Sequence, residues 1–258
     1  MKDLSLRLSR IAGWVSEGST VADIGSDHGL LPIFLVQADR IVRAIAVEVA
    51  EGPFQVLSSA VEDSGYKGRI DTRFGSGLDP IADAEVDAVI LAGMGGHTIW
   101  DILTTRHAQH VLASAATRLL IQPMNGSGLV RYYAEVFGYQ IREDVRVLDG
   151  GVCYECLFLM PGSVRSLTAE DIVKKKAEMD ELGPLDRMKW AFGEKGLAMQ
   201  CSLLSQTMKE EYEKRARALK QLAYPMGDRA QLRAEELRAE CGALLQLYEQ
   251  YFSARLSI

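Results

Sequence analysis

Between about residues 20 and 160, short apolar runs alternate with longer amphipathic segments. The apolar runs are rich in β-branched residues and predict strands at Thr20–Ile24, Arg43–Val47, Ile70–Arg73, Val86–Ala92 and Thr117–Ile121. The segments between them predict helices at Leu30–Gln37, Pro53–Ser64, Ile99–His110 and Gly128–Phe137. Apolar strands that do not alternate with polar residues are typical of strands buried on both faces. The pattern therefore predicts an α/β fold, with helices on both faces of a parallel sheet.

The end of this region predicts an antiparallel hairpin. Two extended runs, Tyr139–Leu148 and Val152–Leu159, flank the tripeptide Asp149-Gly150-Gly151. Glycines between two such runs favour a tight hairpin turn. We therefore expect the parallel sheet to be closed by two antiparallel strands.

Strand patterns stop after residue 162. Residues 165–195 look helical, and apolar residues then recur every three or four positions over 204–223 and 230–252. This spacing predicts two long amphipathic helices. The break at 224–228 predicts that they form an antiparallel hairpin or coiled coil. We therefore predict two domains, residues 1–162 and 163–258.

Composition and charge restrict the class of protein. The 258 residues are 48% hydrophobic and carry a net charge of −6. No apolar run approaches the roughly 18 residues of a membrane span, and we expect no secretory signal. The four cysteines are too few for a disulfide scaffold, which favours the cytoplasm. Residues 1–162 have a net charge of −7 and residues 163–258 of +1, which is weak support for a polyanionic partner of the second domain.

The first candidate site is the turn after the first strand, Asp23-Ile-Gly25-Ser26-Asp27-His28-Gly29. In doubly wound sheets this turn holds a nucleotide-like ligand, because glycine lets the backbone approach it closely. Glu48 ends the second strand 25 residues after Asp23, where a carboxylate accepts hydrogen bonds from a ribose. Asp27 stands where a dinucleotide site has glycine, and its charge would repel a pyrophosphate. The turn therefore favours a cationic, phosphate-free cofactor such as S-adenosyl-L-methionine; a helix cap is the alternative role of Asp27.

Three further candidate sites follow the later strands. They are Gly75-Ser76-Gly77-Leu78, Gly93-Met94-Gly95-Gly96 and Gln122-Pro123-Met124-Asn125. The glycines after the fourth strand leave room for a ligand, and Gln122 and Asn125 offer amide donors and acceptors. Each segment alone also suits an ordinary turn or helix cap. Their joint occurrence after successive strands predicts a Rossmann-like methyltransferase.

The motifs together resemble those of the bacterial tRNA (adenine(22)-N1)-methyltransferases, the TrmK family. The similarity covers residues 1–160 in order and includes Leu6-Arg7-Leu8, Ala22-Asp-Ile-Gly-Ser-Asp-His28, Ala46-Val-Glu48, Gly75-Ser-Gly-Leu78, Gly93-Met-Gly-Gly96 and Gln122-Pro-Met-Asn125. The helical tail resembles the family's C-terminal coiled-coil domain. This resemblance implies methyl transfer from S-adenosyl-L-methionine to N1 of adenine 22 in the D arm of tRNA. The family commonly has an acidic residue where Ser76 stands.

These arguments give each candidate residue an expected role. We expect catalysis by Asp27, which stabilises charge or moves a proton, and by Asn125. The cofactor is expected to bind Asp23, Gly25, Ser26, His28, Glu48, Ser76, Gly77, Gly93, Met94 and Gly95. The tRNA is expected to bind Arg7, Gly96, Gln122, Lys174, Lys175 and Lys176. We expect no metal site, no membrane contact and no DNA partner, and the oligomeric state is left open.

Several alternatives remain open at this point. A small-molecule methyltransferase shares the cofactor site, and a non-catalytic tRNA-binding protein shares the tail. A nicotinamide-dependent dehydrogenase shares the fold but usually has the G-x-G-x-x-G motif that this chain lacks. Cys153 and Cys156 are expected to lie on opposite faces of one strand and to be structural. His107 and His110 share a helix face without further ligands nearby, and a surface role suits them equally well.

Overall fold

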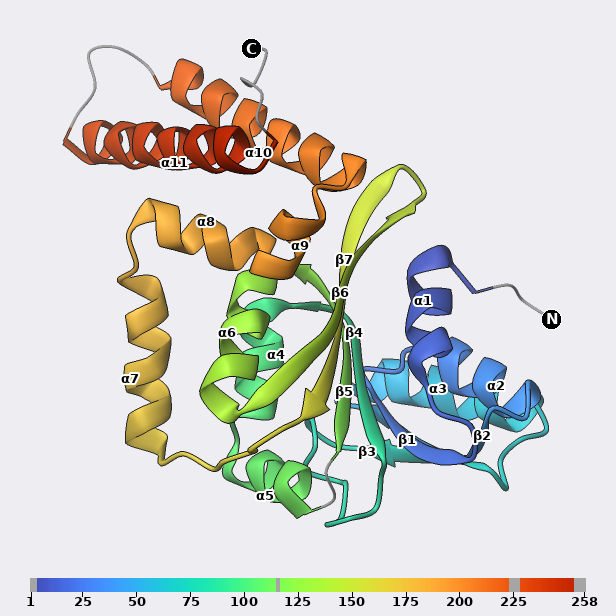
Figure 1. The fold of residues 1–258 in the computed structure, drawn as a ribbon. Coiled ribbons are helices and arrows are strands. Elements are labelled where there is room, and N and C mark those ends of the chain that lie inside the picture. Colours follow the sequence, from blue (N-terminus) through green and yellow to red (C-terminus); the bar gives the residue numbers. More distant parts are fainter. Residues whose placement is uncertain (1–3, 115–116, 223–227, 253–258) are drawn as a thin grey trace. The chain divides into compact units, whose positions relative to one another are not determined.

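The computed structural model describes residues 4–114, 117–222 and 228–252 (Figure 1). The chain forms two compact units, Met1–Lys175 and Lys176–Ile258. The first unit thus extends past residue 162, where the domain boundary was expected. The backbone explains the extension, because the Arg165 N–H donates to the Phe137 carbonyl (3.1 Å) and the Leu167 N–H donates to Gln109 Oε1 (2.6 Å). These bonds fasten the segment after Gly162 to the first unit.

A seven-stranded sheet of order β3-β2-β1-β4-β5-β7-β6 forms the centre of the first unit. Its strands are β1 Ser19–Ile24, β2 Ile41–Glu48, β3 Ile70–Phe74, β4 Ala88–Gly95, β5 Arg118–Asn125, β6 Tyr139–Asp149 and β7 Val152–Pro161. The first five are parallel, and β7 pairs antiparallel with both β5 and β6. Gly150 and Gly151, at φ +57° and +81°, form the predicted hairpin turn. The predicted parallel α/β sheet with its antiparallel hairpin is confirmed.

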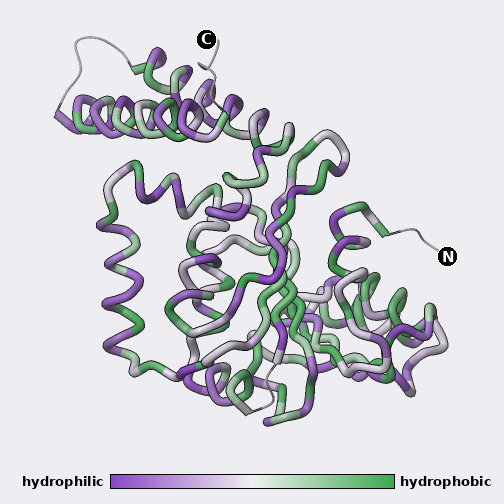
Figure 2. The backbone as a smooth tube through the Cα atoms, in the orientation of Figure 1, coloured by the Kyte–Doolittle hydropathy of each residue, from purple (hydrophilic) through white to green (hydrophobic). Residues whose placement is uncertain are grey.

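Helices cover both faces of this sheet (Figure 1). The helices are α1 Leu6–Trp14, α2 Leu30–Gln37, α3 Glu51–Asp63, α4 Gly96–Leu103, α5 Arg106–Ser114, α6 Ser127–Phe137 and α7 Ala169–Asp180; α7 runs across the unit boundary and is not part of this cover. One core joins α1, α2 and α3 to the central strands, while α4 and α6 pack together on the opposite face. Figure 2 shows the hydrophobic residues concentrated along the strands between these layers. This burial on both faces explains why the strands are continuously apolar.

Two helices differ from the prediction. The expected helix Ile99–His110 is divided into α4 and α5, because the Thr104 hydroxyl donates to the Trp100 carbonyl (2.8 Å) and the Thr105 hydroxyl accepts the Ala108 N–H (3.0 Å). Side-chain bonds of this kind end one helix and begin the next. Helix α1 was not predicted at all. In addition, β4 and β5 continue through Gly93–Gly95 and through Gln122–Asn125, the segments that were expected to follow these strands.

The second unit is helical, as predicted. It contains α8 Pro184–Phe192, α9 Glu194–Met199, α10 Ser202–Gln221 and α11 Asp228–Phe252. The predicted apolar stripes of α10 and α11 face each other, with Leu204, Met208, Leu244 and Tyr248 buried in one core. The predicted break at 224–228 falls mostly on residues 223–227, outside the described residues. None of the described helices is long and apolar enough to cross a membrane.

Candidate active site

The four candidate motifs lie at one edge of the sheet. Strands β1, β2, β4 and β5 are parallel neighbours, so their carboxyl ends meet there. Backbone bonds join the ends directly, from Gly25 N–H to the Val47 carbonyl (2.9 Å) and from Gly75 N–H to the Glu48 carbonyl (3.0 Å). The chain order reverses between β1 and β4, which is the point where doubly wound sheets bind ligands.

The turn after β1 contains a buried carboxyl group and an exposed one. Asp23 is buried and accepts a hydrogen bond from the Ser26 hydroxyl (2.6 Å). Burial raises the pKa of Asp23 to about 6, although the Ser26 bond opposes this and the nearby Glu48 charge adds to it. The Asp27 side chain is 69% exposed, and its carboxylate lies 3.7 Å from the similarly exposed His28 ring. Gly29, rather than Asp27, is the N-cap of α2, and no side chain caps this helix. The alternative role of Asp27 as a helix cap is therefore wrong.

Glu48, the last residue of β2, supplies a carboxylate at this edge of the sheet. Its carboxylate is largely buried and accepts N–H bonds from Asp27 (3.3 Å) and Val49 (3.2 Å). Two exposed apolar side chains lie at the strand ends, Val49 directly after β2 and Phe74 as the last residue of β3. The Phe54 ring packs edge-on against the Phe74 ring, with 5.5 Å between the centroids. Sequence reasoning missed this apolar group, although an apolar residue directly after a strand-ending carboxylate was visible. The Glu48 carboxylate is therefore a polar group at this edge, and Val49, Phe54 and Phe74 form an apolar surface beside it.

The glycines of β4 leave space at the same edge of the sheet. A Cβ atom at Gly93 would meet no heavy atom within 4 Å, whereas one at Gly96 would collide with the Gly126 carbonyl. Gly95 pairs with Asn125 across β4 and β5, and the exposed Asn125 side chain lies over Gly95. Gly25 faces the Met94 methyl group across the same edge. The structure therefore brings the β1, β2, β4 and β5 residues together, with Asn125 above the glycines.

Gln122 and Arg7 occupy the neighbouring part of the edge. Gln122 is fully buried; its Oε1 accepts a bond from Arg7 Nη1 (2.6 Å), and its Nε2 donates to the Pro123 carbonyl (3.0 Å). The Arg7 guanidinium lies over the Tyr154 ring, 5.4 Å from its centroid. The structure thus places Gln122 beneath Arg7 rather than in the open crevice. Sequence reasoning did not identify Tyr154.

The remaining candidates are Ser76, Gly77 and the three lysines 174–176. Ser76 and Gly77 follow β3 at the same edge, and a Cβ atom at Gly77 would lie 2.9 Å from the Ile102 side chain. The three lysines 174–176 lie on α7, and the boundary between the units falls at Lys175. No group of histidine, cysteine or acidic residues in the described ranges is arranged to hold a metal ion. Cys153 and Cys156 are free thiols, and Cys156 is buried.

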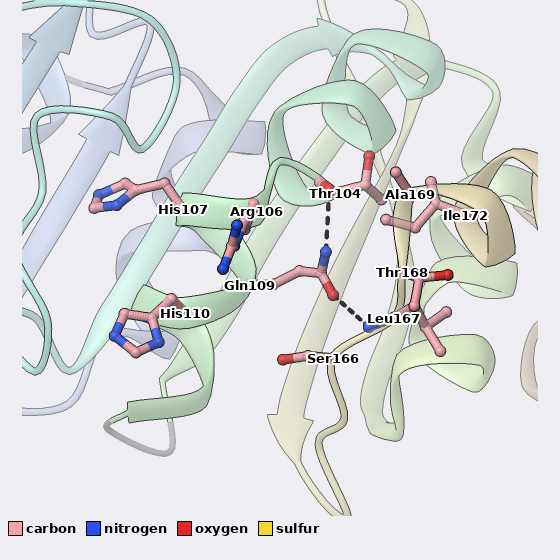
Figure 3. Close-up of a pocket in the computed structure, with 10 residues that line it drawn as sticks. All are labelled: Thr104, Arg106, His107, Gln109, His110, Ser166, Leu167, Thr168, Ala169 and Ile172. Carbon is pink, nitrogen blue, oxygen red and sulfur yellow. Dashed lines mark hydrogen bonds between the residues drawn. The ribbon is translucent and has the colours of Figure 1, made fainter.

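A separate cavity of about 940 Å³ lies beside α5 and the start of α7 (Figure 3). Gln109 crosses it, donating to the Thr104 carbonyl (3.3 Å) and accepting the Leu167 N–H (2.6 Å). His107 bonds the Ile81 carbonyl and His110 pairs with Asp83, each at 2.8 Å. Because α5 leads into the amino end of β5, this cavity is not the candidate active site.

Comparisons with known proteins agree with this geometry. A family model described as a methyltransferase domain matches residues 4–157. The Bacillus subtilis tRNA (adenine(22)-N(1))-methyltransferase is 36% identical over 159 residues, which are 62% of this chain and 66% of that protein. The crystal structure of the B. subtilis M1A22 tRNA methyltransferase TrmK has a TM-score of 0.76 at 26% identity, covering 95% of this chain and 98% of that chain.

A Streptococcus pneumoniae structure gives a similar match. It is assigned as a tRNA (m1A22) methyltransferase and has a TM-score of 0.69 at 30% identity, covering 94% of this chain and 100% of that chain. The same S. pneumoniae protein has been solved in complex with S-adenosyl-L-methionine. These matches cover the helical unit as well as the sheet.

Proposed function

The chain belongs to the family of tRNA (adenine(22)-N(1))-methyltransferases, and we propose that it transfers a methyl group from S-adenosyl-L-methionine to N1 of adenine 22 in tRNA. The observation that carries this proposal is the edge at which β1, β2, β4 and β5 end together. The largely buried Glu48 carboxylate lies there, and the backbone at Gly93 has free space beside it. Since its substrate is a cytoplasmic RNA, we propose that the protein acts in the cytoplasm.

The residues present at this edge fit the cofactor. S-adenosyl-L-methionine supplies an electrophilic methyl group on a positively charged sulfur. Glu48 is anchored by two N–H bonds and would accept the ribose hydroxyls, while Val49 and Phe74 offer apolar surface for the adenine. Gly93 leaves the space that the rest of the cofactor needs. Asp23 holds the β1 turn in shape through Ser26.

The protein's task toward the acceptor is mainly to align it. N1 of neutral adenine carries an in-plane lone pair, so an in-line approach to the methyl group is sufficient for displacement. N1 lies on the Watson–Crick edge, which requires the base to leave its stack. The methylated adenine is cationic, and the exposed Asp27 carboxylate would stabilise that charge or take an N6 proton. Asn125, above Gly95, would orient the base.

A methyl-transfer assay tests the proposed function. We expect the purified protein to transfer labelled methyl groups to unmodified tRNA that carries adenine at position 22. A tRNA with guanine at that position should accept none. Methylation of both tRNAs would contradict adenine 22 as the target. Methylation of small molecules alone would indicate a small-molecule methyltransferase.

The cofactor contact is tested separately by Glu48→Ala. Loss of the ribose acceptor should weaken S-adenosyl-L-methionine binding about tenfold or more in calorimetry, the effect of one lost charged hydrogen bond. Glu51→Ala is the matched control, since Glu51 is exposed on the first turn of α3. Unchanged affinity in a folded Glu48→Ala protein would contradict the assignment.

A further inference from the structure

Tyr154 lies next to the proposed acceptor site, although no part of the mechanism above uses it. Strand β7 pairs antiparallel with β5, so the beginning of β7 lies at the edge where β5 ends. Residues two apart share a face of a strand, which places Tyr154 on the same face as Cys156 and Phe158. Phe158 stacks on Trp14 of α1, so this is the face that α1 covers. The Tyr154 ring is only partly buried there.

Arg7 is held rigidly over this ring. Its Nη1 donates to the fully buried Gln122, and its backbone N–H donates to Asp149 Oδ2 (3.2 Å) at the hairpin turn. The guanidinium centre lies 5.4 Å from the Tyr154 centroid, a distance typical of cation–π contact. Three elements therefore fix one planar cation beside one aromatic ring at the carboxyl edge. A surface arginine without a role would not need this support.

The surroundings of the pair are apolar yet exposed. Three large side chains next to these residues along the chain or in the neighbouring strand are each about half exposed, namely Leu6, Met124 and Val152. Met124 Sδ also contacts the Gln122 amide (3.7 Å). Apolar surface around a planar cation and an aromatic ring suits a ligand with flat apolar faces and a polar rim. A nucleobase has this character.

We propose that Tyr154 and Arg7 form a stacking platform for a base of the RNA substrate, which makes Tyr154 a substrate-positioning residue. This inference rests on the proposed function. Because N1 must face the methyl group, the polar rim of the extruded adenine has to stay free, and the protein must hold the base by its faces. Aromatic rings and arginine planes hold unstacked bases in this way. Position 22 is the base we assign to the platform.

The test compares Tyr154→Leu with Tyr154→Phe. Leucine keeps apolar volume but removes the ring, and stacking energies of single bases correspond to a loss of about tenfold or more in kcat/KM for tRNA. Phenylalanine keeps the ring and should stay within about threefold of the wild type. Tyr66→Leu is the matched control, because Tyr66 is a half-buried tyrosine before β3, at the opposite edge of the sheet. Cofactor affinity should be unchanged in all three variants.

A second measurement reports the stacking itself. In complexes with tRNA carrying 2-aminopurine at position 22, the fluorescence should be quenched by the wild type and Tyr154→Phe more than by Tyr154→Leu. Equal quenching and equal kcat/KM in wild type and Tyr154→Leu would overturn this inference and leave the proposed function unaffected. The inference would also be overturned if both Tyr154→Leu and Tyr154→Phe lost kcat/KM for tRNA and bound the cofactor more weakly. A wild type that leaves adenine 22 unmethylated would overturn the proposed function first.

Discussion

At the scale of single residues, Asp27 has an unusual backbone. Its φ of +49° lies in the left-handed region, which non-glycine residues rarely occupy. The conformation persists because the Asp27 N–H is bound by Glu48 and the flanking turn is tied to β2. Its carboxylate makes no helix-capping bond and lies in solvent at the edge where the methyl group would be transferred. A strained position with an exposed charge is a reason to assign it a functional role.

Asp27→Asn tests this role with little disturbance of the fold. Asparagine tolerates the left-handed region as well as aspartate does, so the turn should keep its shape. We expect the rate of tRNA methylation to fall roughly 10²- to 10⁴-fold, because a carboxylate acting on developing charge lowers the transition state preferentially. Affinity for S-adenosyl-L-methionine, measured by calorimetry, should stay unchanged. A rate within a few-fold of the wild type would leave Asp27 without a catalytic role.

Asp23 makes the stability of the first unit depend on pH. Its pKa rises from 3.8 to about 6 on folding, so the folded state binds its proton more tightly than the unfolded state does. The stabilisation from this group is therefore complete below about pH 4 and is lost as the pH rises through 6. Relative to Asp23→Asn, the wild type should lose about 2 kcal/mol of unfolding free energy between pH 4 and 7.

Urea denaturation at several pH values measures this difference. The exposed Asp63→Asn is the matched control, and its difference from the wild type should not change with pH in this way. A wild type that keeps or gains stability relative to Asp23→Asn as the pH rises from 4 to 7 would contradict the assignment.

At the scale of elements, a buried ion network joins α6 to the hairpin. Arg131 of α6 makes two bonds to Asp144 of β6, both 2.8 Å, and one to Glu155 of β7 (2.7 Å). Arg146 adds a further bond to Glu155, which also accepts a bond from the Ser127 hydroxyl. Burial alone would raise the pKa of Glu155, but the facing guanidinium groups hold it below its usual value. Because Ser127 follows the Asn125-Gly126 turn, this network also supports the acceptor site.

Arg131→Leu should be strongly destabilising. It leaves the buried Asp144 carboxylate without its partner, which typically costs about 3–5 kcal/mol. Arg142→Leu, an exposed change on β6, should stay within about 0.5 kcal/mol. The double variant Arg131→Leu/Asp144→Leu should recover part of the loss, since it removes the unpaired charge. Chemical denaturation of the three variants checks this, and a neutral Arg131→Leu would contradict it.

The same elements show what the sequence predicts and where local patterns are insufficient. The bounds of α2 and the start of the hairpin were predicted correctly, because each begins directly after a glycine with positive φ, Gly29 and Gly138, and this signal is local. The division of α4 from α5 was missed, since it depends on two threonine hydroxyls that bond to the backbone. Contacts between distant residues were not predictable in this way. Gln122 lies 115 positions from Arg7, and no periodicity indicates that the one holds the other.

At the scale of the whole molecule, the charge argument changes with the observed boundary. The tail from residue 163 has a net charge of +1, but residues 176–258 carry 13 Lys+Arg and 13 Asp+Glu. Several exposed basic residues of this unit also pair with acids on their own helices, including Lys214 and Arg217 with glutamates. Surface pairs of this kind contribute little and leave the cation less attractive to phosphate. Net charge therefore does not identify the RNA surface.

Individual lysines are better candidates for phosphate contacts. Lys174 of α7 and Lys220 of α10 are exposed, and neither pairs with a carboxylate within the described ranges. If both contact the tRNA backbone, Lys174→Gln/Lys220→Gln should weaken tRNA binding. Each lost contact should reduce the slope of log affinity against log salt by about 0.7–0.9. Affinity for S-adenosyl-L-methionine should not change.

Fluorescence titrations of tRNA at several salt concentrations measure the slope. Lys67→Gln is the matched control, because Lys67 is an exposed lysine paired with Glu62 near the amino end of β3, where we place no RNA. Its slope should equal that of the wild type, since a lysine away from the RNA displaces no counterions on binding. If the double variant also keeps the wild-type slope, its lysines belong to the solvated helix surface, and the tRNA must be held by other groups.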